Sequence, residues 1–219
     1  MAWTVIAQER WMLYSGIGIR ALDDFTGLPP VYPVYAQLEA QDNAGVWQTV
    51  EADAVVTPTG IISYPALGRS AHATAQPQQA YRTRLLSDFY RPDYLINTDA
   101  IPFVVHPYDD QNPPANFPTI PQTVMLMPAS GYPYPGHIRL VHGVVLDNAN
   151  QPVANAEISE GARERVLSDE RGVFTLPLRW PALNAAVVLD AIDHRTGRTD
   201  QININLPGDL SQGHTFTVT

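Results

Sequence analysis

The amino-acid sequence predicts an all-β protein built from two tandem β-sandwiches. Short runs rich in β-branched and aromatic residues recur along its 219 residues, and turn-forming residues separate them. The twenty prolines and fourteen glycines are many for a helical chain, and they suit frequent turns between short strands. Because 45% of the residues are hydrophobic and only 16% are charged, the chain can bury a substantial core.

The strand–turn–strand pattern is clearest in the second half of the chain. Residues 144–146 form an apolar run that enters a polar turn closing on Gln-Pro at 151–152, and a short run follows at 154–158. Ser-Asp-Glu-Arg-Gly at 168–172 forms a further turn into the apolar run at 173–176. Turns between short β-rich runs are typical of a β-sandwich. Few side chains here perform chemistry, so the region indicates a structural or binding module before an enzyme.

The first half of the chain repeats this plan. Residues 17–22 alternate in polarity and precede a turn at 23–29, as residues 144–146 precede a turn at 147–152. Both segments read Leu-Asp, a short polar turn and then proline. The same strand and turn are therefore predicted twice.

A six-residue motif supports the repeat. Residues 60–65 read Gly-Ile-Ile-Ser-Tyr-Pro and residues 172–177 read Gly-Val-Phe-Thr-Leu-Pro. Glycine permits the positive φ of a turn before the strand, and proline ends the strand because it cannot donate a ladder hydrogen bond. Later apolar runs also correspond: 81–86 with 187–192, and 123–126 with 215–218. The alternative is one larger sheet protein whose halves are similar by chance.

The halves are expected to differ between their last two strands. Residues 88–122 contain seven prolines, which disfavour helix. This segment is either an ordered excursion over the surface or a flexible loop, and its many apolar residues favour order. A Pro/Tyr-rich linker follows at 130–136. We therefore predict an N-terminal sandwich over 1–131 and a C-terminal sandwich over 132–219.

The second half resembles the carboxypeptidase regulatory-like domain, a transthyretin-like (prealbumin-like), Ig-like β-sandwich. Residues 143–147 (GVVLD) and 152–158 (PVANAEI) are similar to the family's G-x-V-x-D and P-v-x-x-A-x-V motifs, and 168–174 (SDERGVF) to T-D-x-x-G-x-F. The resemblance covers about residues 138–219. It implies a seven-stranded sandwich without catalytic residues of its own, with the first half as a diverged relative.

The resemblance also implies a role. Such domains act as stabilising appendages, adhesive modules and adaptors. An acidic tandem without a signal peptide is similar to accessory proteins of phage tails and contractile injection particles, and to adaptor domains on type VI secretion spike tips. The implied function is a non-catalytic structural or adaptor protein that binds other protein subunits of a large assembly, most specifically a phage tail-like or contractile injection particle.

Composition excludes several chemistries. The chain has no cysteine and no lysine, so thiol chemistry, lysine Schiff bases and a phosphate-binding lysine are ruled out. A net charge of −9 without a basic cluster argues against nucleic-acid binding. The N-terminus lacks the basic region of a signal peptide, and no apolar run approaches the ~18–20 residues that span a membrane. We expect cytoplasmic synthesis, no membrane insertion, and a place in a virion or released particle.

The candidates for metal binding and catalysis are weak. The six histidines form no His-x-His pair, so an intradiol dioxygenase-like metalloenzyme is a minor alternative. The C-terminus lacks the Tyr-Arg-Gly-Ser ending of hydroxyisourate hydrolases. Asp109 and Asp110 beside His106 can bind calcium or act in acid–base work, but we favour the interpretation that they form a hydrophilic loop tip. We expect no enzyme activity, no metal and no cofactor.

Aromatic residues are the predicted partner-docking positions. They are Trp3, Trp11, Tyr14, Tyr90, Tyr94, Tyr132 and Tyr134. The apolar N-terminal run containing Trp3 and Trp11 is either core or a docking segment. The linker tyrosines either face a partner or lock the two halves together, and we favour the second. In the alternative function, a carbohydrate- or surface-binding module, Tyr90, Tyr94, Tyr108, Tyr132 and Tyr134 contact a glycan.

Overall fold

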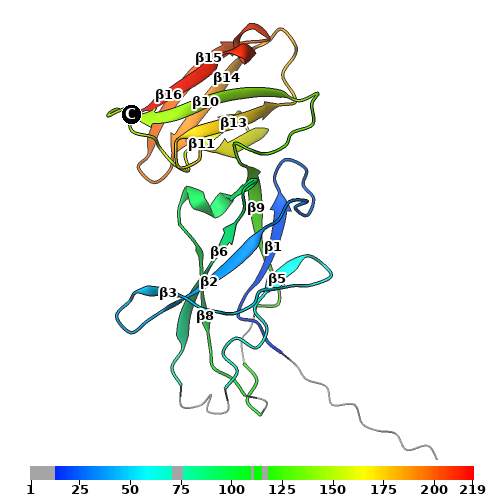
Figure 1. The fold of residues 1–219 in the computed structure, drawn as a ribbon, viewed down its shortest axis with the longest axis vertical. Coiled ribbons are helices and arrows are strands. Elements are labelled where there is room, and N and C mark those ends of the chain that lie inside the picture. The colour runs from blue at the N-terminus through cyan, green and yellow to red at the C-terminus, as the bar shows by residue number, and fades with distance from the viewer. Residues whose placement is uncertain (1–12, 71–75, 110, 115–117) are drawn as a thin grey trace, which may run out of the picture.

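The computed structural model describes residues 13–70, 76–109, 111–114 and 118–219, and it confirms the all-β fold class. The regular structure of these residues consists of β-strands and two short 3₁₀ helices. Figure 1 shows two groups of strands stacked along the long axis of the molecule, with the N-terminal group below and the C-terminal group above.

The first half contains two sheets. The first has the strand order β4 (Val55–Val56), β5 (Ile61–Ser63), β1 (Gly18–Asp23), β9 (Gln122–Pro128) and β7 (Tyr90–Pro92). The second has the order β3 (Trp47–Thr49), β2 (Tyr35–Gln41), β6 (Gln79–Leu86) and β8 (Ile101–Val105). The 3₁₀ helix η2 (Asp93–Ile96) follows β7.

The second half also contains two sheets. One has the order β13 (Val173–Leu178), β10 (Arg139–Asp147) and β16 (Gly213–Val218). The other has the order β12 (Glu164–Leu167), β11 (Glu157–Glu160), β14 (Ala186–Asp193) and β15 (Arg198–Asn205). The 3₁₀ helix η3 (Gly208–Ser211) precedes β16.

Each half has a hydrophobic core between its two sheets. In the first half, Ile19 and Leu126 of one sheet belong to the same buried cluster as Leu38 of the other. In the second half, Phe174 and Phe216 pack with buried residues of β11 and β14, such as Ile158. Alternate residues of each strand therefore enter a core, as in a sandwich whose strands have one buried face.

The two halves share the arrangement of seven strands. Strand β1 lies between β5, to which it is antiparallel, and β9, to which it is parallel. Strand β10 lies in the same way between antiparallel β13 and parallel β16. The other sheets, β3-β2-β6-β8 and β12-β11-β14-β15, also correspond strand by strand. All the pairs of runs that the sequence matched fall on equivalent strands. The domain boundary at 131/132 stays a prediction.

The segment 88–122 differs from the surface excursion that we expected. It contains β7, η2 and β8, and β8 is a regular sheet strand equivalent to β15. Pro102 concealed this strand in the sequence. β8 lies at the edge of its sheet, beside β6. A proline is tolerated on such a strand because no neighbouring strand on the open side needs its missing N–H. The additions of the first half are therefore β4, β7, η2 and the chain between β8 and β9.

Aspartate side chains close several of the turns, and the recurring aspartates of the sequence lie at these positions. The Oδ1 atom of Asp147 accepts hydrogen bonds from the backbone of Ala149 (2.8 Å) and Gln151 (2.9 Å). Asp23, at the equivalent position, accepts from Phe25 at 2.8 Å. Such side-chain bonds to the backbone two residues on stabilise a tight turn locally. Asp42, Asp169 and Asp193 bond the backbone in the same way.

Candidate functional site: the junction between the halves

The structure places the predicted docking residues in different surroundings. Trp3 and Trp11 lie outside the described residues. Tyr14 is half-buried and packs edge-to-face on Tyr108, with ring centroids 5.3 Å apart. Tyr94 packs against the core of the first half, and its hydroxyl accepts a hydrogen bond from the Leu85 backbone at 2.8 Å. The other three tyrosines belong to one cluster.

Tyr90, Tyr132 and Tyr134 meet at the junction between the halves. Tyr90 is only 2% exposed, and its ring centroid lies 5.6 Å from that of Tyr132. Tyr132 in turn lies 4.7 Å from Tyr134. Phe25 and Tyr32 complete the cluster, and Phe25 approaches Tyr134 edge-to-face at 5.2 Å. Pairs of this geometry add to the stabilisation that burial of the rings provides.

Asp23 ties the cluster together. Its Oδ2 atom accepts hydrogen bonds from the hydroxyls of Tyr132 (2.8 Å) and Tyr90 (3.2 Å), while Oδ1 closes the turn after β1. Asp23 is 1% exposed, so these donors satisfy a carboxylate that would otherwise be costly to bury. The Tyr134 hydroxyl reaches the other half and donates to the Thr175 carbonyl at 3.2 Å. The linker tyrosines therefore contact both halves, and their predicted docking role stays a prediction.

Arginines bridge the halves around this cluster. Arg165 of β12 binds Asp24 through two nitrogens, at 3.1 and 3.3 Å. Arg91 of β7 binds Glu170 at 2.9 Å and also donates to Asn155. Arg195 binds Asp99 at 2.8 Å and the carbonyls of Leu95 and Thr98. The planar guanidinium suits such multiple bonds because its donors point in fixed directions.

Arg179 makes the most buried of these contacts. Its nitrogens bind both carboxylate oxygens of Glu164, at 2.5 and 2.9 Å, and the Glu164 side chain is only 3% exposed. A third nitrogen donates to the Phe25 carbonyl of the first half at 2.6 Å, and the guanidinium lies 4.2 Å from the centre of the Phe25 ring. The hydrogen bond to Glu164 raises the pKa of Arg179 further. Arg179 thus joins the halves while neutralising a buried charge.

A small apolar cluster completes the junction. Ile96 and Met127 of the first half pack with Leu167 of the second, and the partly buried Leu95 packs against them. Met127 is fully buried and Leu167 is 1% exposed. The junction therefore combines apolar burial, an aromatic cluster and bidentate arginines. Its arginines were not predicted from the sequence, because each pairs with a residue far away along the chain.

The buried tyrosines give the junction an expected response to alkali. Burial, together with the charge of Asp23, raises the pKa of Tyr90 to about 12, and burial raises the pKa of Tyr94 to about 12. Burial likewise raises the pKa values of Tyr132 and Tyr134. An unfolded tyrosine ionises near ~10. As pH rises from 10 to 12, the unfolded chain loses protons that the folded chain keeps, so stability is full below pH 10 and falls above it.

A spectrophotometric titration of the ten tyrosines checks this expectation. We expect the tyrosinate absorbance to rise in two phases, the later one coinciding with loss of the β-sheet circular dichroism signal. Tyr94→Phe should remove one tyrosine from the later phase. A single phase near pH 10 with the fold intact would contradict the burial of these hydroxyls.

The histidines and acidic residues considered for chemistry do not converge. Among the described residues, no three His, Asp or Glu side chains are grouped closely enough to hold a metal ion. The carboxylate of Asp109 caps its own turn by accepting from the backbone of Gln111 (2.9 Å) and Asn112 (2.7 Å). Asp110 lies outside the described residues, and His106 is exposed. Within the described chain, no helix is both long and apolar enough to cross a membrane.

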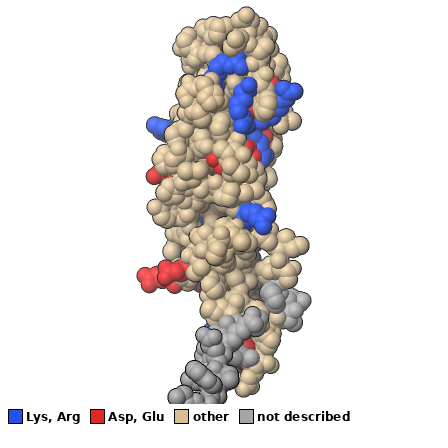
Figure 2. All heavy atoms as spheres, turned by 90° about the vertical axis from the view of Figure 1, so that its right-hand side faces the viewer, with Lys and Arg blue, Asp and Glu red and all other residues tan. Residues whose placement is uncertain are grey.

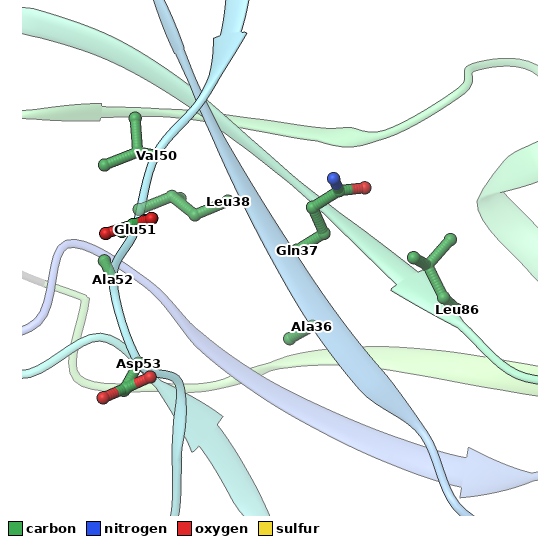
Figure 3. A pocket seen from close by; sticks show the side chains of 8 residues that line it. All are labelled: Ala36, Gln37, Leu38, Val50, Glu51, Ala52, Asp53 and Leu86. Carbon is green, nitrogen blue, oxygen red and sulfur yellow. The ribbon is translucent and has the colours of Figure 1, made fainter.

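An open groove of about 670 Å³ lies between β2 and the chain that follows β3 (Figure 3). Residues 50–53 form one side and residues 36–38 the other. The backbone N–H of Val50 donates a hydrogen bond to the Leu38 carbonyl (2.9 Å), and beyond this bond the chain at 51–53 separates from β2. The groove therefore exposes a short edge of β2 beside the carboxylates of Glu51 and Asp53, which are both exposed.

A second hollow, which we call the junction cleft, lies beside the arginine contacts and has a volume of about 420 Å³. Its walls include Arg84, Ser87, Tyr94 and Asp99 of the first half, and Asn155 and Glu170 of the second. Most of the arginine side chains visible in Figure 2 lie over the upper part of the molecule, which is the second half. The junction cleft is where side chains of both halves line one concave surface.

Comparison with known proteins does not assign a family. No family model matches the chain, and no curated protein matches it. Two solved structures align with it weakly. The Bacillus anthracis TIE protein is 13% identical over 95% of this chain and 34% of that chain, with a TM-score of 0.29. The Streptococcal ancillary pilin is 10% identical over 94% of this chain and 68% of that chain, with a TM-score of 0.27. The chain thus spans about a third of the length of the TIE structure.

Proposed function

We propose that this protein is a non-catalytic structural or adaptor protein that acts through contacts with other protein subunits. The observation that carries the proposal is the junction, where four arginines from both halves and a buried tyrosine cluster join two halves that share seven equivalent strands. A connection of this kind holds two binding surfaces at a fixed distance and angle. Fixed geometry is what a connecting subunit needs, because partner sites must be presented together.

The finer proposal concerns the assembly. The resemblance of the second half to the carboxypeptidase regulatory-like domain, and the matched topology of the first half, support a tandem of transthyretin-like modules. We propose a phage tail-like or contractile injection particle as the assembly, with the protein carried in the virion or released particle. The predicted docking role of the N-terminal aromatics Trp3 and Trp11 belongs to this proposal.

Affinity purification from the native source, followed by mass spectrometry, tests the function. We expect a tagged full-length chain to bring down a defined set of subunits, and the untagged protein to sediment with large particles in a native lysate. Disassembly of the particles by high salt or mild denaturant should return it to the size of the free chain, 24.1 kDa. A protein that sediments only as the free chain, with no subunits recovered, would overturn the proposal.

A further inference from the structure

The junction cleft contains hydrogen-bond donors that no acceptor in the described part of the chain uses. The Nε atoms of Arg84 and Arg91 are buried and have no hydrogen-bond partner. The terminal nitrogens of Arg84 also meet no acceptor among these residues. The Tyr94 hydroxyl accepts from the Leu85 backbone at 2.8 Å but donates to none of them. The buried Nε atoms are beyond the reach of a ligand, but the terminal nitrogens of Arg84, whose side chain is 35% exposed, are available to an acceptor that enters the cleft.

The charged residues that line the cleft, together with the charged groups that they contact, carry one positive charge in excess. Glu39 is hydrogen-bonded by Arg82, and the Nε atom of Arg84 approaches the same carboxylate only to 3.6 Å. One carboxylate therefore faces two guanidinium groups. The other charges of the cleft are matched, because Glu170 pairs with Arg91 (2.9 Å) and Asp99 pairs with Arg195 (2.8 Å). The lining itself carries two positive and two negative residues, and the excess arises from Arg82, Arg195 and Glu39, which contact it.

We propose that the junction cleft binds a carboxylate side chain, aspartate or glutamate, presented by a partner protein. Arg84 is the anchor, since its side chain is 35% exposed and its terminal nitrogens can form the parallel pair of bonds that a carboxylate accepts. Tyr94 lines the same wall. A single carboxylate matches the single excess charge. This inference rests on the proposed function, because it names the chemistry of the partner.

Binding of an acetylated and amidated tetraglutamate peptide to the full-length chain tests the inference, with the tetraglutamine peptide as the uncharged control. We expect tetraglutamate to bind and tetraglutamine not to bind. Arg84→Gln should weaken tetraglutamate binding about ten-fold or more, because a hydrogen bond to a charged group is lost together with the charge. Binding should also weaken as salt rises. Arg84→Lys keeps the charge but loses the planar pair of donors, so its affinity for tetraglutamate should lie between that of the parent chain and that of Arg84→Gln.

Arg20→Gln is the matched control. Arg20 is exposed on β1 of the same half, and the described residues provide no partner for its side chain. This variant changes the net charge as Arg84→Gln does, and it should bind tetraglutamate as the parent chain does. Circular dichroism of both variants checks that the sheets are retained.

Equal affinity of the parent and Arg84→Gln chains would overturn the assignment, as would equal binding of the two peptides. Binding of glucuronate without binding of tetraglutamate would overturn the proposal that the partner is a protein. These failures are separable from failure of the proposed function. If subunits are still recovered from the native source while the peptide does not bind, the adaptor role stands and the cleft assignment falls.

Discussion

Replacing Gly172 by alanine is expected to destabilise the second half by roughly 4 kcal/mol. Gly172 has a φ of +74°, and a Cβ atom there would lie 2.4 Å from the Val145 carbonyl oxygen. The left-handed conformation costs an L-residue about 1–2 kcal/mol. Overpacking against a buried backbone adds about 1–3 kcal/mol, because a carbonyl in the middle of β10 cannot move aside. Urea unfolding followed by circular dichroism measures the change.

The repeat supplies the control for this prediction. Gly60 is the equivalent residue of the first half, with a φ of +77°, but a Cβ atom there would meet nothing within 4 Å. Gly60→Ala should therefore cost only the conformational strain, about 1–2 kcal/mol. Equal losses for the two variants would show that the close approach of Gly172 to β10 carries no energetic weight.

Replacing Arg179 by alanine is expected to cost roughly 3–5 kcal/mol, the usual loss when one partner of a buried ion pair is removed. The reason is the carboxylate that stays behind: Glu164 is 3% exposed, and Arg179 is its ion-pair partner in the described chain. The same change removes the bond to the Phe25 carbonyl and the contact with the Phe25 ring. Thermal unfolding measures the stability, and limited proteolysis of the linker at 130–136 reports on the junction.

Two further variants isolate the cause. Arg163→Ala removes an arginine from an exposed turn of the same half, and the change should stay within about 0.5 kcal/mol. Arg179→Met combined with Glu164→Leu replaces the pair by apolar side chains and should recover much of the loss, because no unpaired charge stays buried. If the double variant is no more stable than Arg179→Ala, the loss belongs to the contacts with Phe25 instead.

The candidate site could be predicted only in part. The linker tyrosines were identified from sequence, and so was their capacity to lock the halves together, because Pro-Tyr alternation in a linker is a local signal. Tyr90 was proposed for docking, yet it is 2% exposed and donates to Asp23. No local signal distinguishes a buried tyrosine from an exposed one, because burial depends on contacts with residues far away along the chain. The junction cleft, built from Arg84, Glu170 and their neighbours, could not be inferred from spacing at all.

The sequence by itself determined the fold class and the internal repeat. Alternating apolar residues, turn-closing aspartates and glycines at positive φ act over a few residues, so they can be read from the chain in order. The correspondence of 60–65 with 172–177 anticipated strands that occupy equivalent places beside β1 and β10.

The tertiary structure decided what those strands do together. It revealed β8 behind Pro102, set the close approach of Gly172 to Val145, and matched each bridging arginine to its partner across the junction. These contacts join residues far apart in sequence, and their energies depend on distance and burial. Neither quantity exists until the sheets have packed.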